Sequence, residues 1–170
     1  GAKVVLAQDW MLGSSISQRG TYNSNLLLTP TNPTSAFGSI TIPELKLERS
    51  SPTSSVTLDG QFKFAEYINH SELNSQDQNI SLDASKDLSE RSTLNFTGHF
   101  DHDTTLSSDR DITGRFLDRQ IHFISWDVAP SWTYQLSPID NINWSGSYSA
   151  VNYSNTTLET DYRIYGSTFG

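Results

Sequence analysis

The side chains best suited to bind a metal ion are concentrated in one short segment, His99-Phe100-Asp101-His102-Asp103. On an extended strand, His99, Asp101 and Asp103 would project from one face, because alternate side chains point the same way. Imidazole nitrogens and carboxylate oxygens at that spacing could hold a divalent cation. A polar strand face that runs into an acidic loop explains the segment more simply, since the water-facing side of a strand commonly has this composition. We therefore predict no metal ligand and no cofactor.

A second charged group lies a few residues further along the chain, at Asp109, Arg110, Asp111 and Arg115. It could hold a divalent ion or contact the phosphates of lipopolysaccharide. Charge-rich loops are more often simply solvated. The sequence therefore favours a solvated loop here.

Hydrolytic chemistry would require a nucleophile, a base and a group that orients the base. The chain has four histidines and many serines and aspartates, and outer-membrane hydrolases use such residues. Because serine is so abundant, pairings with histidine arise by chance, and no G-x-S-x-G motif occurs. The sequence predicts no catalytic residue and a protein that is not an enzyme.

Composition narrows the class of protein. The 170 residues are 35% hydrophobic and 11% aromatic, with no cysteine, a net charge of -8 and a mean hydropathy of -0.47. The absence of cysteine excludes disulfides and thiolate metal sites, and the acidic charge argues against nucleic-acid binding. No apolar run approaches the roughly 20 residues of a membrane helix. A transmembrane β-barrel reconciles a hydrophilic average with aromatic strands, because half of each strand faces water.

The elements that must position these side chains are β-strands, and the clearest two lie between Ile121 and Tyr153. Apolar and polar residues alternate as far as Leu136, and the alternation resumes after Ser137-Pro138-Ile139-Asp140. The pattern predicts two long strands joined by a tight turn, each with one apolar and one polar face. The first run is about thirteen residues, whereas strands of soluble sheets usually have about five or six. A strand that crosses a bilayer at a tilt needs about nine to eleven.

Alternation elsewhere predicts about eight strands in a single β-barrel domain over residues 1–170. Residues 1–9 form an N-terminal segment, and the weak alternation of the next stretch leaves its place in the barrel wall open. A change of phase near Pro43 predicts a bulge or a strand entry. Long polar loops alternate with short turns, and the long loops are expected near residues 29–38, 69–78, 103–119 and 153–161. This arrangement predicts an all-β, antiparallel, up-and-down transmembrane barrel with its long loops at one end.

Alternation also assigns side chains to two faces of the predicted sheet. The set predicted to face the lumen is Asp59, Gln61, Lys63, Asp83, Asn95, His99 and Asp127. The aromatic residues of the other face are predicted to contact lipid and to form the two girdles at the membrane interfaces. They are Phe62, Phe64, Phe96, Phe100, Trp126, Trp132, Tyr134, Trp144 and Tyr148. A β-sandwich whose aromatic face forms the core would show the same period.

One phrase, Ala129–Ser137 (APSWTYQLS), is followed by Pro138-Ile139-Asp140. It is similar to a P-x-W-x-Y-x-L-[ST]-E-R strand and turn, with the acidic-basic pair replaced. Further phrases are TYNSNL at 21–26 with Thr29-Pro30, LSERST at 88–93, DTTLSS at 103–108 and Thr113-Gly114. In this order, over residues 10–170, the phrases resemble the proteobacterial outer-membrane β-barrel proteins associated with exopolysaccharide export clusters.

The resemblance implies a porin-like barrel in the outer membrane of a Gram-negative bacterium, in contact with lipid and lipopolysaccharide. It would act as a channel, an anchor or a component of an envelope export assembly with other envelope proteins. Members of that family are usually longer, so a closed eight-stranded barrel and a part of a larger barrel both stay open. Pairing of the first and last strands would distinguish them. The alternative function is that of a soluble or fibre-forming β-sandwich, a surface or adhesin module.

Overall fold

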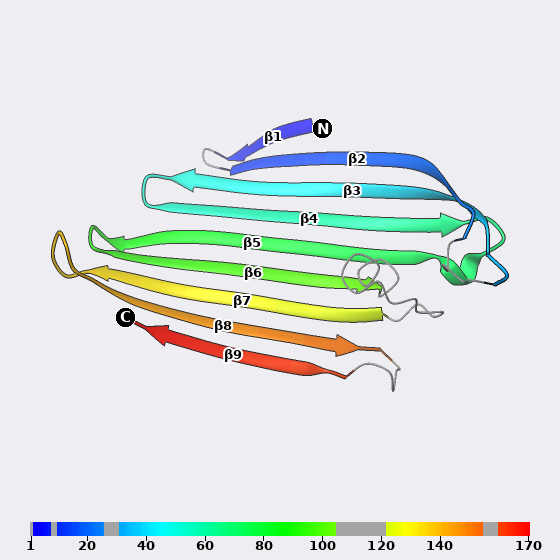
Figure 1. Cartoon of the computed structure of the whole chain (residues 1–170). Coiled ribbons are helices and arrows are strands. Elements are labelled where there is room, and N and C mark those ends of the chain that lie inside the picture. Colours follow the sequence, from blue (N-terminus) through cyan, green and yellow to red (C-terminus); the bar gives the residue numbers. More distant parts are fainter. Residues whose placement is uncertain (1, 8–9, 26–30, 105–121, 155–159) are drawn as a thin grey trace.

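The computed structural model describes residues 2–7, 10–25, 31–104, 122–154 and 160–170. These residues form nine strands of one antiparallel sheet, in which each strand lies beside its neighbours in sequence (Figure 1). The strands are β1 (Ala2–Ala7), β2 (Trp10–Asn23), β3 (Ala36–Ser51), β4 (Ser54–Tyr67), β5 (Ser75–Ser89), β6 (Ser92–Thr104), β7 (His122–Gln135), β8 (Asn141–Tyr153) and β9 (Tyr162–Phe169).

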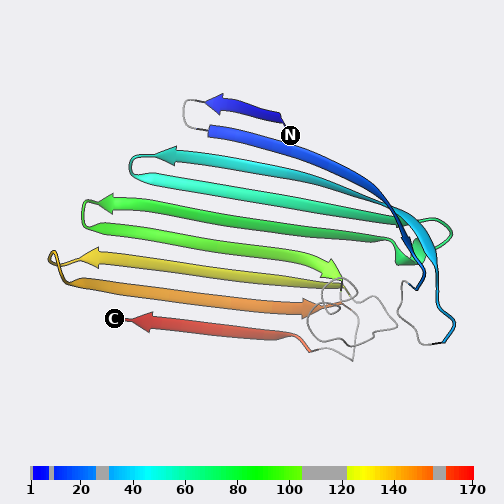
Figure 2. The same ribbon diagram turned by 45° about the horizontal axis from the view of Figure 1, so that its top comes forward.

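The two ends of the sheet differ in their connections (Figures 1 and 2). At the end that we call the turn end, short connections join β3 to β4 at residues 52–53, β5 to β6 at residues 90–91 and β7 to β8 at residues 136–140. Strands β2, β4, β6 and β8 finish at the opposite end, which we call the loop end. In the described part of the chain, no helix has the length and apolarity needed to cross a bilayer.

The all-β antiparallel class is confirmed, and each of the eight expected strands appears, as β2 to β9. Strand β1 is an addition, because residues 2–7 show no alternation that distinguishes them as a strand. The weakly alternating first strand does join the sheet, because β2 pairs with β3 from Trp10 to Asn23 without a change of register. Cross-strand backbone pairing therefore extends further than the hydrophobic pattern reveals.

Some expected loop boundaries are wrong, because the strands extend into them. Residues 75–78 belong to β5 and residues 36–38 to β3. In the first case polar side chains occupy both faces, so hydropathy does not reveal the strand, although Ser75 pairs with Ala65. Residues 103–104 similarly end β6, residue 153 ends β8, and residues 105–119 lie outside the described part of the chain.

The bulge or strand entry expected at Pro43 is also wrong. Pro43 lies in the middle of β3, opposite Ile16 of β2, and the β2–β3 register is constant on both sides of it. Against β4, the pairs Thr41–Phe64 and Glu44–Gln61 keep one register, and the residues between them are not paired. Proline has no N–H to donate to the ladder, so the pairing is interrupted without any shift of the strand.

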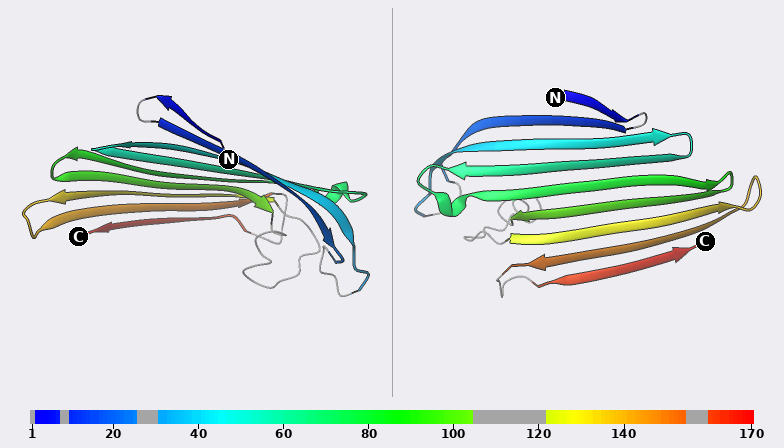
Figure 3. Two further views of the ribbon diagram at one scale, coloured as in Figure 1. Left: turned by 90° about the horizontal axis from the view of Figure 1, so that it is seen from above. Right: turned by 180° about the vertical axis from the view of Figure 1, so that it is seen from behind.

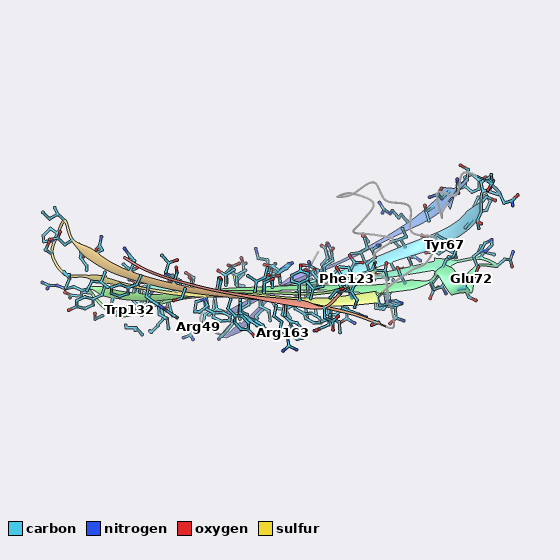
Figure 4. The ribbon with its side chains drawn as sticks, turned by 60° about the horizontal axis from the view of Figure 1, so that its bottom comes forward. Arg49, Tyr67, Glu72, Phe123, Trp132 and Arg163 are labelled. Atoms are coloured by element: carbon cyan, nitrogen blue, oxygen red, sulfur yellow. The ribbon has the colours of Figure 1, made fainter. Side chains whose placement is uncertain are left out.

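The register divides the side chains between two faces, because directly paired residues lie on the same side of the sheet. One face, the apolar face, presents the even-numbered residues of β2 and β4 to β8 and the odd-numbered residues of β3 and β9. The polar face presents the others. In Figure 4, Arg49, Trp132 and Arg163 lie on the apolar side of the sheet, and Tyr67 and Phe123 lie on the polar side.

The most deeply buried hydrophobic cluster of the described residues is small and lies at the loop end of the polar face. Ala36 and Leu73 are 2% and 7% exposed and pack against Tyr67. Leu73 belongs to a short 3-10 helix, η1 (Ser71–Leu73), between β4 and β5. The backbone N–H of Tyr67 donates to Oδ1 of Asn74 at 2.8 Å, which holds the segment against the end of β4.

Gly38 allows the close approach of β3 and β4 at this cluster. A Cβ added there would lie 2.6 Å from the backbone oxygen of Glu66 and 2.7 Å from Cδ1 of Tyr67. We expect Gly38→Ala to lower the free energy of unfolding by about 1–3 kcal/mol, the usual cost of overpacking. Urea denaturation followed by tryptophan fluorescence measures the change. Gly20→Ala on β2 is the matched control, because a Cβ there meets nothing within 4 Å, and equal stability of the two variants would contradict the prediction.

Among the described residues, the sheet is open at both edges. Strand β1 pairs with β2, β9 pairs with β8, and no pairing joins β1 to β9 (Figure 3). All eight residues of β9 are exposed. Each edge therefore presents backbone N–H and C=O groups that a neighbouring strand must satisfy if the sheet is surrounded by lipid.

Candidate functional site

A row of polar side chains crosses the middle of the polar face. Each of six consecutive strands contributes one residue, and each residue is directly paired with the next: Ser15, Glu44, Gln61, Asn79, Asp101 and Ser125. We call this set the polar row. It arises because the register places one polar side chain from each of these six strands at the same level.

Hydrogen bonds organise the polar row around its two carboxylates. Ser15 Oγ donates to Oε2 of Glu44 at 2.8 Å, and Gln61 Nε2 donates to Oε1 of the same group at 2.7 Å. Asn79 Nδ2 donates to Oδ1 of Asp101 at 2.6 Å, and Ser125 Oγ lies 3.4 Å from Oδ2. Neutral donors on both neighbouring strands thus orient each carboxylate, and His99 of the same strand also contacts Asp101, with Nε2 2.8 Å from Oδ2.

A recess of about 230 Å³ lies next to the polar row, on the side of the loop end. We call it the acidic recess, and its lining comes from β4, β5 and β6: Gln61, Lys63, Asp77, Gln78, Asn79, Asp101 and Asp103. Lys63 Nζ lies 2.7 Å from Oδ2 of Asp77, its direct partner across the strands. The side chain of Asp77 is 10% exposed and that of Lys63 is 29% exposed, so this ion pair is largely buried.

The two oxygens of Asp77 differ in their surroundings. Oδ2 accepts a hydrogen bond from Nζ of Lys63 and lies 3.4 Å from the hydroxyl of Ser75. Oδ1 is buried and has no hydrogen-bond partner among the described residues. The carboxyl group of Asp103 lies close enough for the two acidic groups to interact. The acidic recess therefore has three carboxyl groups in its lining, of which those of Asp77 and Asp103 are neighbours, beside a single lysine.

The residues first considered as metal ligands do share a face, as the alternation predicts. His99, Asp101 and Asp103 project from the polar side of β6, and His99 Nε2 lies 2.8 Å from Oδ2 of Asp101. Within the described ranges, no three His, Asp or Glu side chains form a group that could hold a metal ion. Asp101, two residues along the same strand, thus gives His99 a hydrogen-bond partner. The charged segment 109–115 lies outside the described residues.

All seven residues predicted to face a lumen lie on the polar face of the sheet: Asp59, Gln61, Lys63, Asp83, Asn95, His99 and Asp127. All nine residues predicted to face lipid lie on the apolar face: Phe62, Phe64, Phe96, Phe100, Trp126, Trp132, Tyr134, Trp144 and Tyr148. The structure thus brings each set together. That water meets one face and lipid the other stays a prediction.

Aromatic residues of the apolar face gather towards both ends of the strands. Near the turn end, Trp132 is paired directly with Trp144, and its ring centroid lies 5.9 Å from that of Tyr134. Near the loop end, the rings of Phe100 and Trp126 are 4.4 Å apart. Aliphatic residues, including Leu58, Leu82 and Val128, lie between these groups, together with Tyr148, which pairs directly with Val128. This order matches the two girdles and apolar band of a membrane-spanning wall.

The indole N–H groups of two of these residues are satisfied within the sheet. Trp132 Nε1 donates to the hydroxyl of Ser92 at 2.8 Å, and Trp144 Nε1 donates to that of Ser167 at 3.2 Å. Trp126 leaves 46% of its surface exposed. Trp132 and Trp144 thus contribute apolar ring area to this face while their N–H groups remain hydrogen-bonded.

Sequence reasoning missed Ser15, Glu44 and Asp77, three important members of this surface. Ser15 and Glu44 lie on strands with weak or phase-shifted alternation, and Asp77 was expected in a loop. The signal that identifies them is the cross-strand register, because each is directly paired with another polar residue of the site.

A protein-family model described as "Putative beta-barrel porin 2" matches residues 6–163. No curated protein and no solved structure matches the chain. The matched range includes the polar row, the acidic recess and the nine aromatic residues of the apolar face listed above.

Proposed function

The chain belongs to the family described as "Putative beta-barrel porin 2", and on this premise we propose that it forms the wall of an outer-membrane barrel whose polar face lines a passage for small polar solutes. The observation that carries the proposal is the sidedness of the sheet. Across β2 to β8, large apolar side chains gather on one face, and most charged side chains lie on the other. An outward apolar band and a polar interior are the marks of porin-type barrels.

Strand length supports the same proposal. Strands β2 to β8 each contain 13 to 16 residues, and a tilted membrane-spanning strand needs about 9 to 11. The extra residues would carry the strands beyond the hydrocarbon layer on one or both sides. Soluble sheets usually have strands of about five or six residues.

A β-sandwich would require a second layer to cover the apolar face. The nine described strands all belong to a single sheet, and large residues of the apolar face, such as Trp126 and Phe64, are 46% and 38% exposed. A lipid environment would cover this surface without a second sheet. We therefore favour the barrel over the sandwich or adhesin module.

Several finer assignments belong to this proposal. We propose that the barrel is not an enzyme, that it contacts outer-membrane lipid and lipopolysaccharide, and that it functions in a Gram-negative envelope. A role in exopolysaccharide export, as an anchor or with other envelope proteins, rests on the resemblance of sequence phrases such as Ala129–Ser137. The sidedness of the sheet supports the passage of solutes more directly.

We expect the full-length protein that contains this chain to require detergent for solubility and to migrate differently on a gel before and after heating. Reconstituted into a planar bilayer of outer-membrane lipids, it should produce discrete conductance steps in potassium chloride. Heat-denatured protein in the same detergent is the control. Full solubility in plain buffer would contradict the barrel and favour the sandwich. A heat-modifiable barrel that conducts no ions would contradict the passage and leave an anchor or scaffold.

A further inference from the structure

The charges on the polar face are strongly unequal. In β2 to β8 this face carries three basic side chains, Arg19, Lys46 and Lys63. It carries nine acidic ones: Glu44, Glu48, Asp59, Asp77, Asp83, Asp87, Asp101, Asp103 and Asp127. The same strands place Arg49, Glu66 and Lys86 on the apolar face. The excess negative charge of the described strands therefore lies on one side of the sheet.

Within this face, the acidic recess contains a buried carboxylate oxygen that accepts no hydrogen bond from the described residues. Asp77 is 8% exposed, and its Oδ1 atom has no hydrogen-bond partner among the described residues. The carboxyl group of Asp103 lines the same recess and interacts with that of Asp77. An ionised carboxylate only accepts hydrogen bonds, so two ionised groups would leave Oδ1 without a donor. Two adjacent carboxylates become compatible when a positive charge approaches them or when one of them takes up a proton.

We propose that the acidic recess is the cation-selecting site of the passage, where small cations are favoured over anions. The inference rests on the proposed function, because it specifies which solutes the polar face admits. Lys63 balances part of the charge of Asp77, while Asp101 and Asp103 add two further carboxyl groups to the same lining. Carboxylates that line a constriction raise the local concentration of cations and exclude anions.

The polar row strengthens this selection by fixing the position of its carboxylates. Asp101 accepts from Asn79 on one side and lies within 3.4 Å of the Ser125 hydroxyl on the other, so its oxygens are held at the edge of the recess. Asn79 and Ser125 are neutral donors that orient the group, and His99 Nε2, 2.8 Å from Oδ2, holds it from the same strand. A mobile carboxylate on a loop would present a weaker and less localised field.

The test is the reversal potential of reconstituted full-length protein across a tenfold gradient of potassium chloride. The expected potential has the sign of potassium selectivity. Asp103→Asn should move it several-fold closer to zero, because one recess carboxylate is lost at nearly constant volume. Asp83→Asn is the matched control: it removes the same charge from an exposed position of the polar face outside the recess lining, and it should change the potential much less.

Asp101→Asn provides a second recess variant if Asp103→Asn does not fold, as judged by heat-modifiable migration. Conductance with no preference for potassium, or with a preference for chloride, would overturn the selectivity while leaving the passage intact. Equal effects of the recess and control variants would overturn the location. Absence of conductance in folded wild-type protein would instead contradict the proposed function itself. Each failure is therefore distinguishable from the others.

Discussion

Lys63→Met is expected to lower the free energy of unfolding by about 3–5 kcal/mol, the usual cost of removing one partner of a buried ion pair. The lysine is the cation 2.7 Å from Asp77, whose side chain is 10% exposed. Without it, Asp77 would remain buried beside Asp103 with no opposing charge. Urea denaturation of the protein in detergent micelles, followed by tryptophan fluorescence, measures the loss.

Two variants make this prediction specific. Lys46→Met removes a lysine from a pair with Glu48 whose side chains are 49% and 33% exposed, so it should lower the free energy of unfolding much less than Lys63→Met does. The double variant Lys63→Met/Asp77→Leu removes both buried charges and should recover most of the stability. If Lys63→Met costs no more than Lys46→Met, the buried pair does not stabilise the sheet in the way described.

Leu82→Arg is expected to cost about 2–4 kcal/mol if the apolar face meets lipid, because an arginine near the bilayer midplane loses its hydration. Leu82 is the central residue of β5, on the apolar face between Leu58 and Gly98. The free energy of folding into lipid vesicles, obtained from urea titration, gives the value.

Ser81→Arg is the control for this substitution, since Ser81 is the adjacent residue and projects from the polar face. An arginine there should meet water and acidic side chains, so the cost should be small. The opposite ranking would place the polar face against lipid. Equal costs of the two substitutions would contradict the predicted sidedness.

Much of the fold follows from alternation, and residues of β7 and β8 explain why. Trp126, Val128, Trp132 and Trp144 are large and apolar at even positions, while serines, asparagines and Asp127 occupy odd positions. When one face of a strand is apolar and the other polar, hydropathy alone identifies the strand and its two sides. The same holds for Phe62 to Phe64 and for Leu94 to Phe100, which explains why the aromatic set lies together in the structure.

Alternation fails where a strand is polar on both faces or changes phase. Residues 75–78 are Ser, Gln, Asp and Gln, so nothing in their hydropathy separates the strand from a loop. The pattern therefore predicts a loop at Asp77, which lies in β5. In β3, Ile40 and Ile42 lie on the polar face near the loop end, whereas Leu45 and Leu47 lie on the apolar face. The change of phase at Pro43 therefore does not mark a bulge. It arises because, near the loop end, β3 places two apolar residues on the polar face of the sheet.

The polar row could not be derived from any one segment, because its members come from six strands between Ser15 and Ser125. Its existence depends on register, and register depends on backbone pairing over more than a hundred residues. The charges of the acidic recess are visible in the sequence. Their proximity is a property of the assembled sheet.

The odd number of described strands has a geometric consequence for a continuous wall. Since neighbours alternate in direction, β1 and β9 point the same way. If β1 and β9 paired directly, that pair would be parallel. Pairing β9 with β1 of a second copy inserted in the same orientation would also give a parallel pair. Bacterial barrels made of one chain are antiparallel throughout, with even strand numbers. A wholly antiparallel wall therefore requires an odd number of strands between these two edges.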